Sequence, residues 1–220
     1  MFILKINRIY IIDNYTWNLF YIYDVANVKI MSIVTDDSVS MDDIESWQNE
    51  VDETKKHDLL KKIVMSMKDV ITFPEIAHVR DHDTIPFGES GYLIYHSDNI
   101  PEYLNWVLCV IKSNDDFRNS WAAIHQLITS EKLDKLAVNI ASLVKATLNP
   151  GFLISAEIAR FTASLISEYL ANKGDVQLGL LCQSLSRAEH YKYGDWKQSG
   201  VQDLTRNMTV DYSLFSYTIP

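Results

Sequence analysis

Cysteine, proline and glycine are all scarce in this 220-residue chain, which holds two cysteines, five prolines and seven glycines. Two cysteines cannot form the network of disulfides on which small secreted scaffolds depend. So little glycine and proline argues against collagen-like, linker-like and disordered classes. Because 47% of the residues are hydrophobic, the chain can build a core, and we expect a single domain spanning residues 1–220.

Basic charge is also in short supply, since 20 lysines and arginines face 29 aspartates and glutamates, for a net charge of −9. Recognition of nucleic-acid phosphates needs a basic face, so no nucleic-acid partner is expected. Lys5 and Arg8 interrupt the apolar N-terminus, and no small-residue cleavage site follows it, which argues against a signal peptide and favours a cytoplasmic protein. Cys109 and Cys182 each lie in an apolar run and are expected to be buried thiols, with one disulfide as the alternative.

The longest helical pattern covers residues 115–173, and its second half repeats apolar side chains at helical spacing. Glu157, Arg160 and Glu168 interrupt that repeat and exclude a transmembrane span, which needs about 20 predominantly apolar residues. Glu157 and Arg160 are spaced to pair across one turn. A short turn at 149–151 predicts an antiparallel hairpin of two long helices, the second of them central to the fold.

A second, acidic helix is expected at about 41–69, with a break near 52–55. Alternating or β-branched residues predict strands at 2–12, 17–23, 27–34, 75–80, 92–96, 103–112, 176–187 and 208–217. The alternation breaks near Arg8, which indicates a β-bulge. Residues 103–112 are apolar on both faces, which is typical of a central strand. The segments 81–88 and 190–200 are expected to be loops, the second polar and aromatic.

These patterns predict an α+β protein: an antiparallel β-sandwich, C2-like or jelly-roll-like, with the long helical hairpin and the acidic helix as insertions at about 115–173 and 41–69. Strands and helices do not alternate regularly, so a Rossmann-like fold is disfavoured. The architecture by itself implies no function.

Motifs with known chemistry are absent from the sequence, which has no GxGxxG, P-loop, GxSxG, HExxH or CxxC. We therefore favour a non-catalytic protein over an enzyme. One cluster of metal-ligand types is present, namely His78, Asp81, His82 and Asp83. In an extended strand the two histidines would lie about 13 Å apart, too far to share an ion. A solvated polar loop is the favoured interpretation.

Aspartates on the expected loops form a second candidate site. In C2-like sandwiches such residues at one end hold calcium, because hard cations take several oxygen ligands. The predicted metal ligands are Asp13, Asp36, Asp37, Asp81 and Asp83. A solvated acidic surface is the favoured interpretation, so no cofactor is expected, with calcium as the alternative.

The third candidate is the aromatic loop near the C-terminus, with Tyr191, Tyr193 and Trp196 as predicted partner-binding residues. Tyrosine and tryptophan are enriched at interfaces. The alternative is that these rings pack on the edge of the chain's own sheet.

Three functions follow, in order of preference. The first is a non-catalytic binding or assembly protein, structural or self-associating, with a protein partner or a second copy of itself. The second is a C2-like module that depends on calcium or another divalent cation. The third is a membrane-active toxin or effector that uses its apolar helical hairpin, and membrane contact is the least favoured of the partner interactions.

Overall fold

A computed structural model of the chain describes residues 1–16, 25–36, 41–65, 69–112, 127–146, 150–173 and 175–218. The strand expected at 17–23 lies outside these residues. The described residues form two antiparallel sheets and four helices. The expectation of a β-rich α+β protein is therefore confirmed.

Sheet A consists of β1 (Phe2–Ile11), β5 (Thr84–Pro86), β6 (Tyr92–Ser97), β9 (Gly194–Gln202) and β10 (Met208–Ser216). Sheet B consists of β2 (Ala26–Asp36), β3 (Asp69–Thr72), β4 (Ile76–Val79), β7 (Tyr103–Lys112) and β8 (Val176–Ser186). The helices are α1 (Met41–Asn49), α2 (Glu53–Met65), α4 (Ser130–Ala146) and α5 (Pro150–Lys173).

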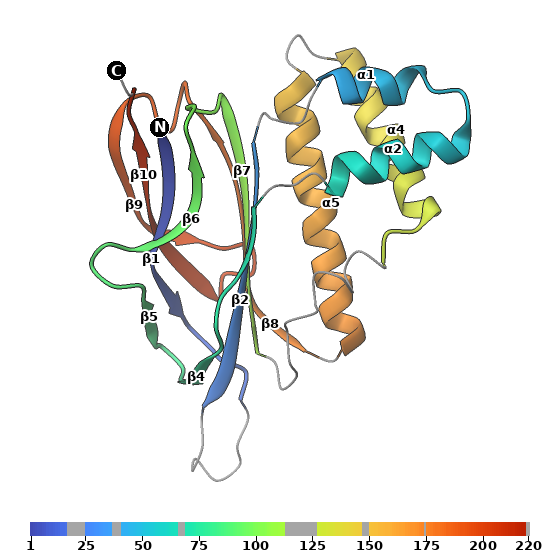
Figure 1. Ribbon diagram of the computed structural model, residues 1–220. Coiled ribbons are helices and arrows are strands. Elements are labelled where there is room, and N and C mark those ends of the chain that lie inside the picture. Colours follow the sequence, from blue (N-terminus) through green and yellow to red (C-terminus); the bar gives the residue numbers. More distant parts are fainter. Residues whose placement is uncertain are drawn as a thin grey trace.

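The elements form three layers, with sheet A outermost, sheet B in the middle and the helices on the far side of sheet B (Figure 1). Alternate side chains of both sheets fill the space between them, from Phe2 and Ile9 of β1 to Leu108 of β7. This is the largest core of the molecule. The two termini lie side by side at one end of sheet A, where the Tyr217 amide donates to the Met1 carbonyl at 2.9 Å.

The two sheets share one layout. In sheet A, β1 and β10 are central, β9 is one edge, and β5 and β6 divide the other edge by pairing with different parts of β1. In sheet B, β2 and β7 are central, β8 is one edge, and β3 and β4 divide the other edge of β2. A groove opens between these two divided edges.

Helix α5 covers the outer face of sheet B. Its residues Ala159, Ala163 and Ile166 pack against Met31 and Val107 of the central strands. A buried polar bridge holds the two layers in register, because Asn105 of β7 and Ser155 of α5 are hydrogen-bonded at 2.5 Å. Covered on both sides, β7 is buried from Leu104 to Ile111, as its two apolar faces predicted.

The helical insertions leave sheet B at opposite ends. Helices α1 and α2 follow β2, whereas α4 and α5 follow β7, which runs antiparallel to β2. All four helices meet in a separate cluster that includes Trp47, Leu60, Ile140 and Ile158. The pairing expected within α5 is confirmed, since Arg160 Nη1 lies 2.8 Å from a Glu157 carboxylate oxygen. Helices α4 and α5 pack on each other.

The acidic helix expected at 41–69 is in fact two helices and a strand. Its break falls at residues 50–52, slightly before the predicted place. Asp52 causes it, because its side chain accepts hydrogen bonds from the amides of Thr54 (2.9 Å) and Lys55 (3.2 Å) and so caps the start of α2. The last expected residue, Asp69, begins β3, where pairing with residues 31–34 of β2 overrides the local pattern.

Both expected loops contain strands. Within 81–88, β5 pairs with β1, and within 190–200, β9 begins at Gly194 and forms a hairpin with β10. Edge strands such as β9, which is exposed at most positions, need no alternation of apolar residues, so the sequence carried no strand signal there. The bulge expected near Arg8 is confirmed by a register shift between Ile6 and Arg8.

Candidate functional site

An open groove separates the divided edges of the two sheets. It has a volume of about 480 Å³ and is bounded by β4 and the end of β3 on one side and by β5 and the start of β6 on the other. Among the described strands, β4 pairs with β2 alone and β5 pairs with β1 alone. We call this hollow the edge groove; its lining is Phe73, Pro74, Glu75, Ile76, Ala77, His78, Val79, Asp83, Thr84, Ile85, Pro86, Phe87 and Tyr92.

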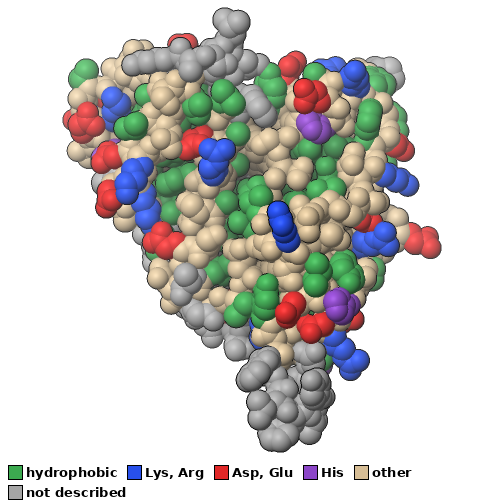
Figure 2. Space-filling model, turned by 180° about the vertical axis from the view of Figure 1, so that it is seen from behind, with side chains coloured by type: hydrophobic (Ala, Val, Ile, Leu, Met, Phe, Trp, Pro, Cys, Tyr) green, Lys and Arg blue, Asp and Glu red, His purple; other side chains and the backbone are tan. Residues whose placement is uncertain are grey.

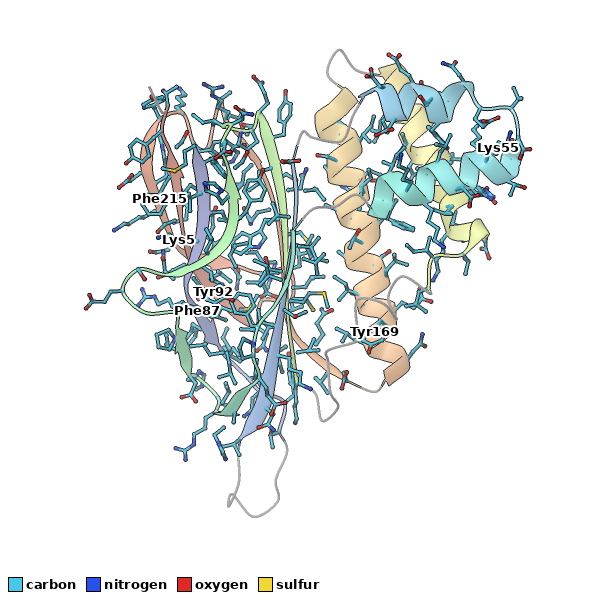
Figure 3. All side chains as sticks on the ribbon, in the orientation of Figure 1. Lys5, Lys55, Phe87, Tyr92, Tyr169 and Phe215 are labelled. Atoms are coloured by element: carbon cyan, nitrogen blue, oxygen red, sulfur yellow. The ribbon has the colours of Figure 1, made fainter. Side chains whose placement is uncertain are left out.

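Three aromatic rings from both sheets meet at one end of the edge groove. The Phe73 ring centroid lies 4.5 Å from that of Tyr92 and 5.4 Å from that of Phe87. Figure 3 shows Phe87 and Tyr92 close together between the layers, with centroids 6.3 Å apart. Tyr92 is 40% exposed and its neighbour Leu93 is 48% exposed. Tyr92 is therefore accessible, whereas Phe73 is buried and helps to join the two sheets.

One carboxylate on the rim of the groove is close to a buried lysine that lies outside the groove lining. Lys29 of β2 is 6% exposed, and its Nζ lies 3.5 Å from a carboxylate oxygen of Glu75 at the rim. His78, also on the rim, has a left-handed backbone with φ of 61°. Such a conformation is uncommon for a residue other than glycine and often occurs at functional sites. It also interrupts the regular edge of β4.

The aspartates predicted to bind calcium fall at both ends of the sandwich. Hydrogen bonds join residues 11–14 to 81–83, which brings Asp13, Asp81 and Asp83 to one end. Asp36 lies at the other end of β2, where its carboxylate accepts the Tyr95 hydroxyl at 2.6 Å. Asp37 lies outside the described residues.

Each of the three neighbouring aspartates accepts a backbone hydrogen bond within 2.7 Å: Asp13 from Tyr15, Asp81 from Asn14 and Asp83 from Arg80. These bonds organise the loops that carry them. Within the described ranges, no group of three or more histidine, cysteine or acidic side chains is arranged to hold a metal ion. The calcium site stays a prediction.

The aromatic loop divides into a buried part and an exposed part. Tyr191 is fully buried, and its ring centroid lies 4.6 Å from that of Phe2 in the core between the sheets. Trp196 of β9 packs partly against the same core. Tyr193 is 57% exposed. Tyr191 is therefore closed to a partner, while Tyr193 is accessible.

The histidines contact groups that orient them. His57 Nε2 meets an Asp134 carboxylate oxygen at 2.7 Å across α2 and α4. The Ser186 amide donates to His190 Nδ1 at 3.0 Å, and the Ser186 hydroxyl lies 3.4 Å from the same nitrogen. Because that nitrogen already accepts the amide proton, it is poorly placed to take a proton from the hydroxyl. The contact closes the turn after β8.

A second hollow of about 540 Å³ lies in the helical layer between α1, α2 and α4. Trp47 forms its floor, Lys56 lies over the indole at 5.8 Å, and the His57–Asp134 pair crosses it. These contacts join the two helical insertions, so the hollow has a structural role in holding the helices together.

The two cysteines are free thiols on the helix-facing side of sheet B. Burial raises the pKa of the Cys109 thiol to about 12, with a smaller contribution from Cys182. Burial also raises the pKa of Cys182, which is less deeply enclosed. Thiols that hold their protons so firmly are poor nucleophiles, and Cys109 is a core residue.

Most residues of the edge groove were not predicted from the sequence. His78 and Asp83 were candidates, but none of the aromatic side chains of the groove was. One signal was present: Phe73-Pro74 and Pro86-Phe87 each join an aromatic residue to a proline. Proline within a sheet is confined to edges, strand ends and bulges. The aromatic neighbours of these prolines were therefore candidates for an exposed sheet edge.

No described helix is both long and apolar enough to cross a membrane. Comparisons of the chain with protein-family models, with curated proteins and with solved structures found no match. The geometry of the candidate sites is therefore the basis for the function proposed next.

Proposed function

We propose that this chain is a non-catalytic binding protein that holds an apolar segment of a protein partner in the edge groove. The observation that carries the proposal is the aromatic cluster of Phe73, Phe87 and Tyr92 at the junction of the two sheets, in which Tyr92 is exposed and rests on the buried Phe73. Accessible aromatic side chains that bury further on binding are the usual anchors of protein interfaces.

A protein segment suits the groove better than a small molecule does. The volume alone fits either, because small-molecule pockets span about 300–1,000 Å³. However, the apolar surface continues beyond the groove to the exposed Leu93. Among the described strands, β4 and β5 each have a strand partner on one side only, so the other edge of each can offer backbone hydrogen bonds to an extended chain. Because His78 interrupts β4, we expect a short segment anchored by one apolar side chain rather than a long added strand.

The test is a selection of short random peptides displayed on phage against the wild-type protein. The expected sequences carry aromatic or large aliphatic residues. Tyr92→Ser should weaken the best peptide about five- to thirtyfold, because loss of an anchor residue costs about 1–2 kcal/mol. Tyr193→Ser is the matched control, since Tyr193 is also exposed, more so than Tyr92, but lies outside the groove. Equal binding by both variants would contradict the proposal, as would a selection that enriches no peptide.

A second copy of the chain is the alternative partner. Light scattering distinguishes the two cases, because the monomer has a mass of 25.3 kDa. A larger mass that returns to the monomer in Tyr92→Ser would identify the groove as a self-association surface. A wild-type monomer at high concentration would leave a different protein as the occupant.

We also propose that the sandwich is C2-like or jelly-roll-like. The support is that each five-stranded sheet has two central strands, one edge made by a single strand and one edge divided between two strands. The membrane-active alternative has less support, because it requires the apolar face of α5 to leave its packing on sheet B.

Calcium binding is the second candidate, favoured by the gathering of Asp13, Asp81 and Asp83 at one end of the sandwich. Millimolar calcium should raise the melting temperature, since a ligand that binds only the folded state stabilises it. Asp81→Asn should abolish that rise, whereas Asp36→Asn at the opposite end should retain it. An unchanged melting temperature in wild type would remove this candidate.

A further inference from the structure

A polar hollow of about 410 Å³ crosses the outer face of sheet A and shares only Thr84 with the lining of the edge groove. Four strands contribute its lining: Arg8 and Tyr10 of β1, Thr84 of β5, Ser199 and Gly200 of β9, and Thr209 and Asp211 of β10. These side chains alternate with core residues such as Ile9 and Val210, so they face away from sheet B. We call this hollow the sheet-face pocket.

Two β-bulges flank the centre of the sheet-face pocket. One is the register shift between Ile6 and Arg8 of β1, which places Arg8 opposite Asp211. The other interrupts the pairing of β9 with β10 between Val210 and Tyr212, again at Asp211. Bulges redirect side chains and are frequent next to binding sites. Here they interrupt the pairing of β10 with β1 and with β9, in both cases beside the Asp211 carboxylate.

Gly200 adds to the opening. Its φ of +66° is the left-handed conformation that glycine adopts without strain, and open space surrounds the position that a Cβ atom would occupy. The Gly200 amide donates to Asp211 Oδ1 at 2.7 Å. The bulge in β9 thus both supplies a hydrogen bond to the carboxylate and leaves room above it.

The charges of the pocket cancel each other. Asp211 is 9% exposed, and its second oxygen accepts a hydrogen bond from Arg8 Nε. That bond uses one of the five N–H donors of the guanidinium, and the Arg8 side chain is 59% exposed. A carboxylate can accept about four hydrogen bonds, so Asp211 keeps acceptor capacity. The pair therefore offers donors and acceptors side by side without net charge.

An aromatic ring lies at one side of the pocket. The Tyr10 hydroxyl contacts His82 Nδ1 at 3.0 Å, and the two rings are nearly parallel, with 26° between their planes. This contact fixes the orientation of the Tyr10 ring. A fixed aromatic face with an apolar surface and a polar tip suits a ligand that is itself apolar on one face and polar at its edges.

We propose that the sheet-face pocket binds a neutral polyhydroxylated ring, that is, a sugar. Neighbouring hydroxyl groups of a sugar can accept from Arg8 and donate to Asp211 at the same time. The hydroxyls of Thr84, Ser199 and Thr209 serve either role, and the Tyr10 ring offers a surface to the C–H face of the sugar. A ligand anion would meet the Asp211 carboxylate, and an apolar ligand would leave these polar groups unpaired.

Saturation-transfer NMR of the full chain with a panel of neutral hexoses, pentoses and N-acetylhexosamines tests the proposal. At least one sugar should give a signal at millimolar concentration. The double variant Thr84→Val/Ser199→Ala removes two hydroxyls at exposed positions and should weaken that sugar about tenfold. Tyr10→Leu should weaken it further by removing the flat face. Tyr92→Ser is the control: it alters the edge groove and should leave sugar binding unchanged.

Several results would overturn the proposal. A panel without any binder to the wild-type protein excludes a neutral sugar as the ligand class. A sugar that binds the double variant and Tyr10→Leu as well as wild type binds elsewhere. A sugar signal lost on addition of equimolar inorganic phosphate indicates that the pocket prefers anions. Because the control variant tests the groove alone, failure here leaves the proposed peptide binding intact, and the reverse also holds.

Discussion

The two sheets share a layout but differ in what covers them. Sheet B lies between sheet A and α5, and β7 is buried at every position from Leu104 to Ile111. Sheet A packs on one side only, so β1 alternates buried residues with half-exposed ones. Because both faces of its central strand are covered, sheet B contributes to the proposed binding surfaces only through its edge at β4, among the residues that the structure describes. Both proposed binding surfaces involve sheet A, one at its edge and one on its outer face.

The reverse side of the molecule has a surface of mixed charge. Figure 2 shows lysine, arginine and acidic side chains interspersed with apolar ones over that side. Mixed charge of this kind is typical of an ordinary soluble surface. The edge groove differs from it because three aromatic rings gather there.

The largest expected change in the free energy of unfolding comes from placing a charge on the outer face of sheet B rather than at a matched position of sheet A. Val107→Asp places a charge between sheet B and α5, at a position 2% exposed, and should cost about 4 kcal/mol or more. Ile3→Asp, on the half-exposed face of β1, should cost about 1–2 kcal/mol. Urea unfolding measures both. Equal losses in the free energy of unfolding would show that α5 does not keep water away from the outer face of sheet B.

The next effect concerns the junction of the two sheets. The buried carboxylate of Asp203 accepts hydrogen bonds from the amides of Leu180 (2.8 Å), Thr205 (3.0 Å), Asn207 (3.1 Å) and Met208 (2.9 Å). Asp203→Ala removes the shared acceptor of these amides, of which Asn207 keeps a contact with the Thr205 hydroxyl at 3.3 Å, and should cost about 3 kcal/mol. Asp203→Asn keeps one acceptor oxygen and should cost less. A drop in melting temperature no larger for alanine than for asparagine would argue against this network.

A smaller effect depends on pH. The unfolded thiol of Cys109 ionises near its ordinary pKa of 9.0, whereas the folded protein holds this proton to about 12. The stability that the protonated thiol contributes is therefore complete below pH 9 and declines by about 1 kcal/mol per pH unit between 9 and 12. Chemical unfolding at pH 8 and pH 10 should show this decline, and Cys109→Ala should reduce it. An identical decline in both proteins would place the cause in other groups.

The smallest effect separates binding from stability. Tyr92 is 40% exposed, so Tyr92→Ser should lower the free energy of unfolding by less than about 1 kcal/mol while it weakens peptide binding. Thermal unfolding of the variant provides this measurement. A large loss of stability would mean that the aromatic cluster acts chiefly to join the sheets.

Much of the fold could be predicted, because strong patterns coincide with buried elements. The apolar run of β7 predicted a central strand, and the break in alternation near Arg8 predicted the bulge that now lies in the sheet-face pocket. The edge strands β5 and β9 were missed. Pairing with β1 and β10 holds them in place, and such pairing leaves little trace in the local sequence.

The candidate sites were harder to predict, because exposure depends on neighbours that lie far away in the chain. Tyr191 and Tyr193 look alike in the sequence, but one is fully buried against Phe2 and the other is 57% exposed. Likewise, nothing in the sequence brings Phe73 to Tyr92 or Arg8 to Asp211, pairs that only the assembled sheets create.

The sequence by itself determined the α+β class, the central strand, the buried character of α5 and the Glu157–Arg160 pair, since these depend on periodicity and on neighbours within one or two turns. Tertiary structure decided which edges stay open and which polar side chains converge. Those outcomes depend on register between strands up to about two hundred residues apart, such as β1 and β10. A shift of one residue in that register would turn every side chain to the opposite face, and the sheet-face pocket would not form.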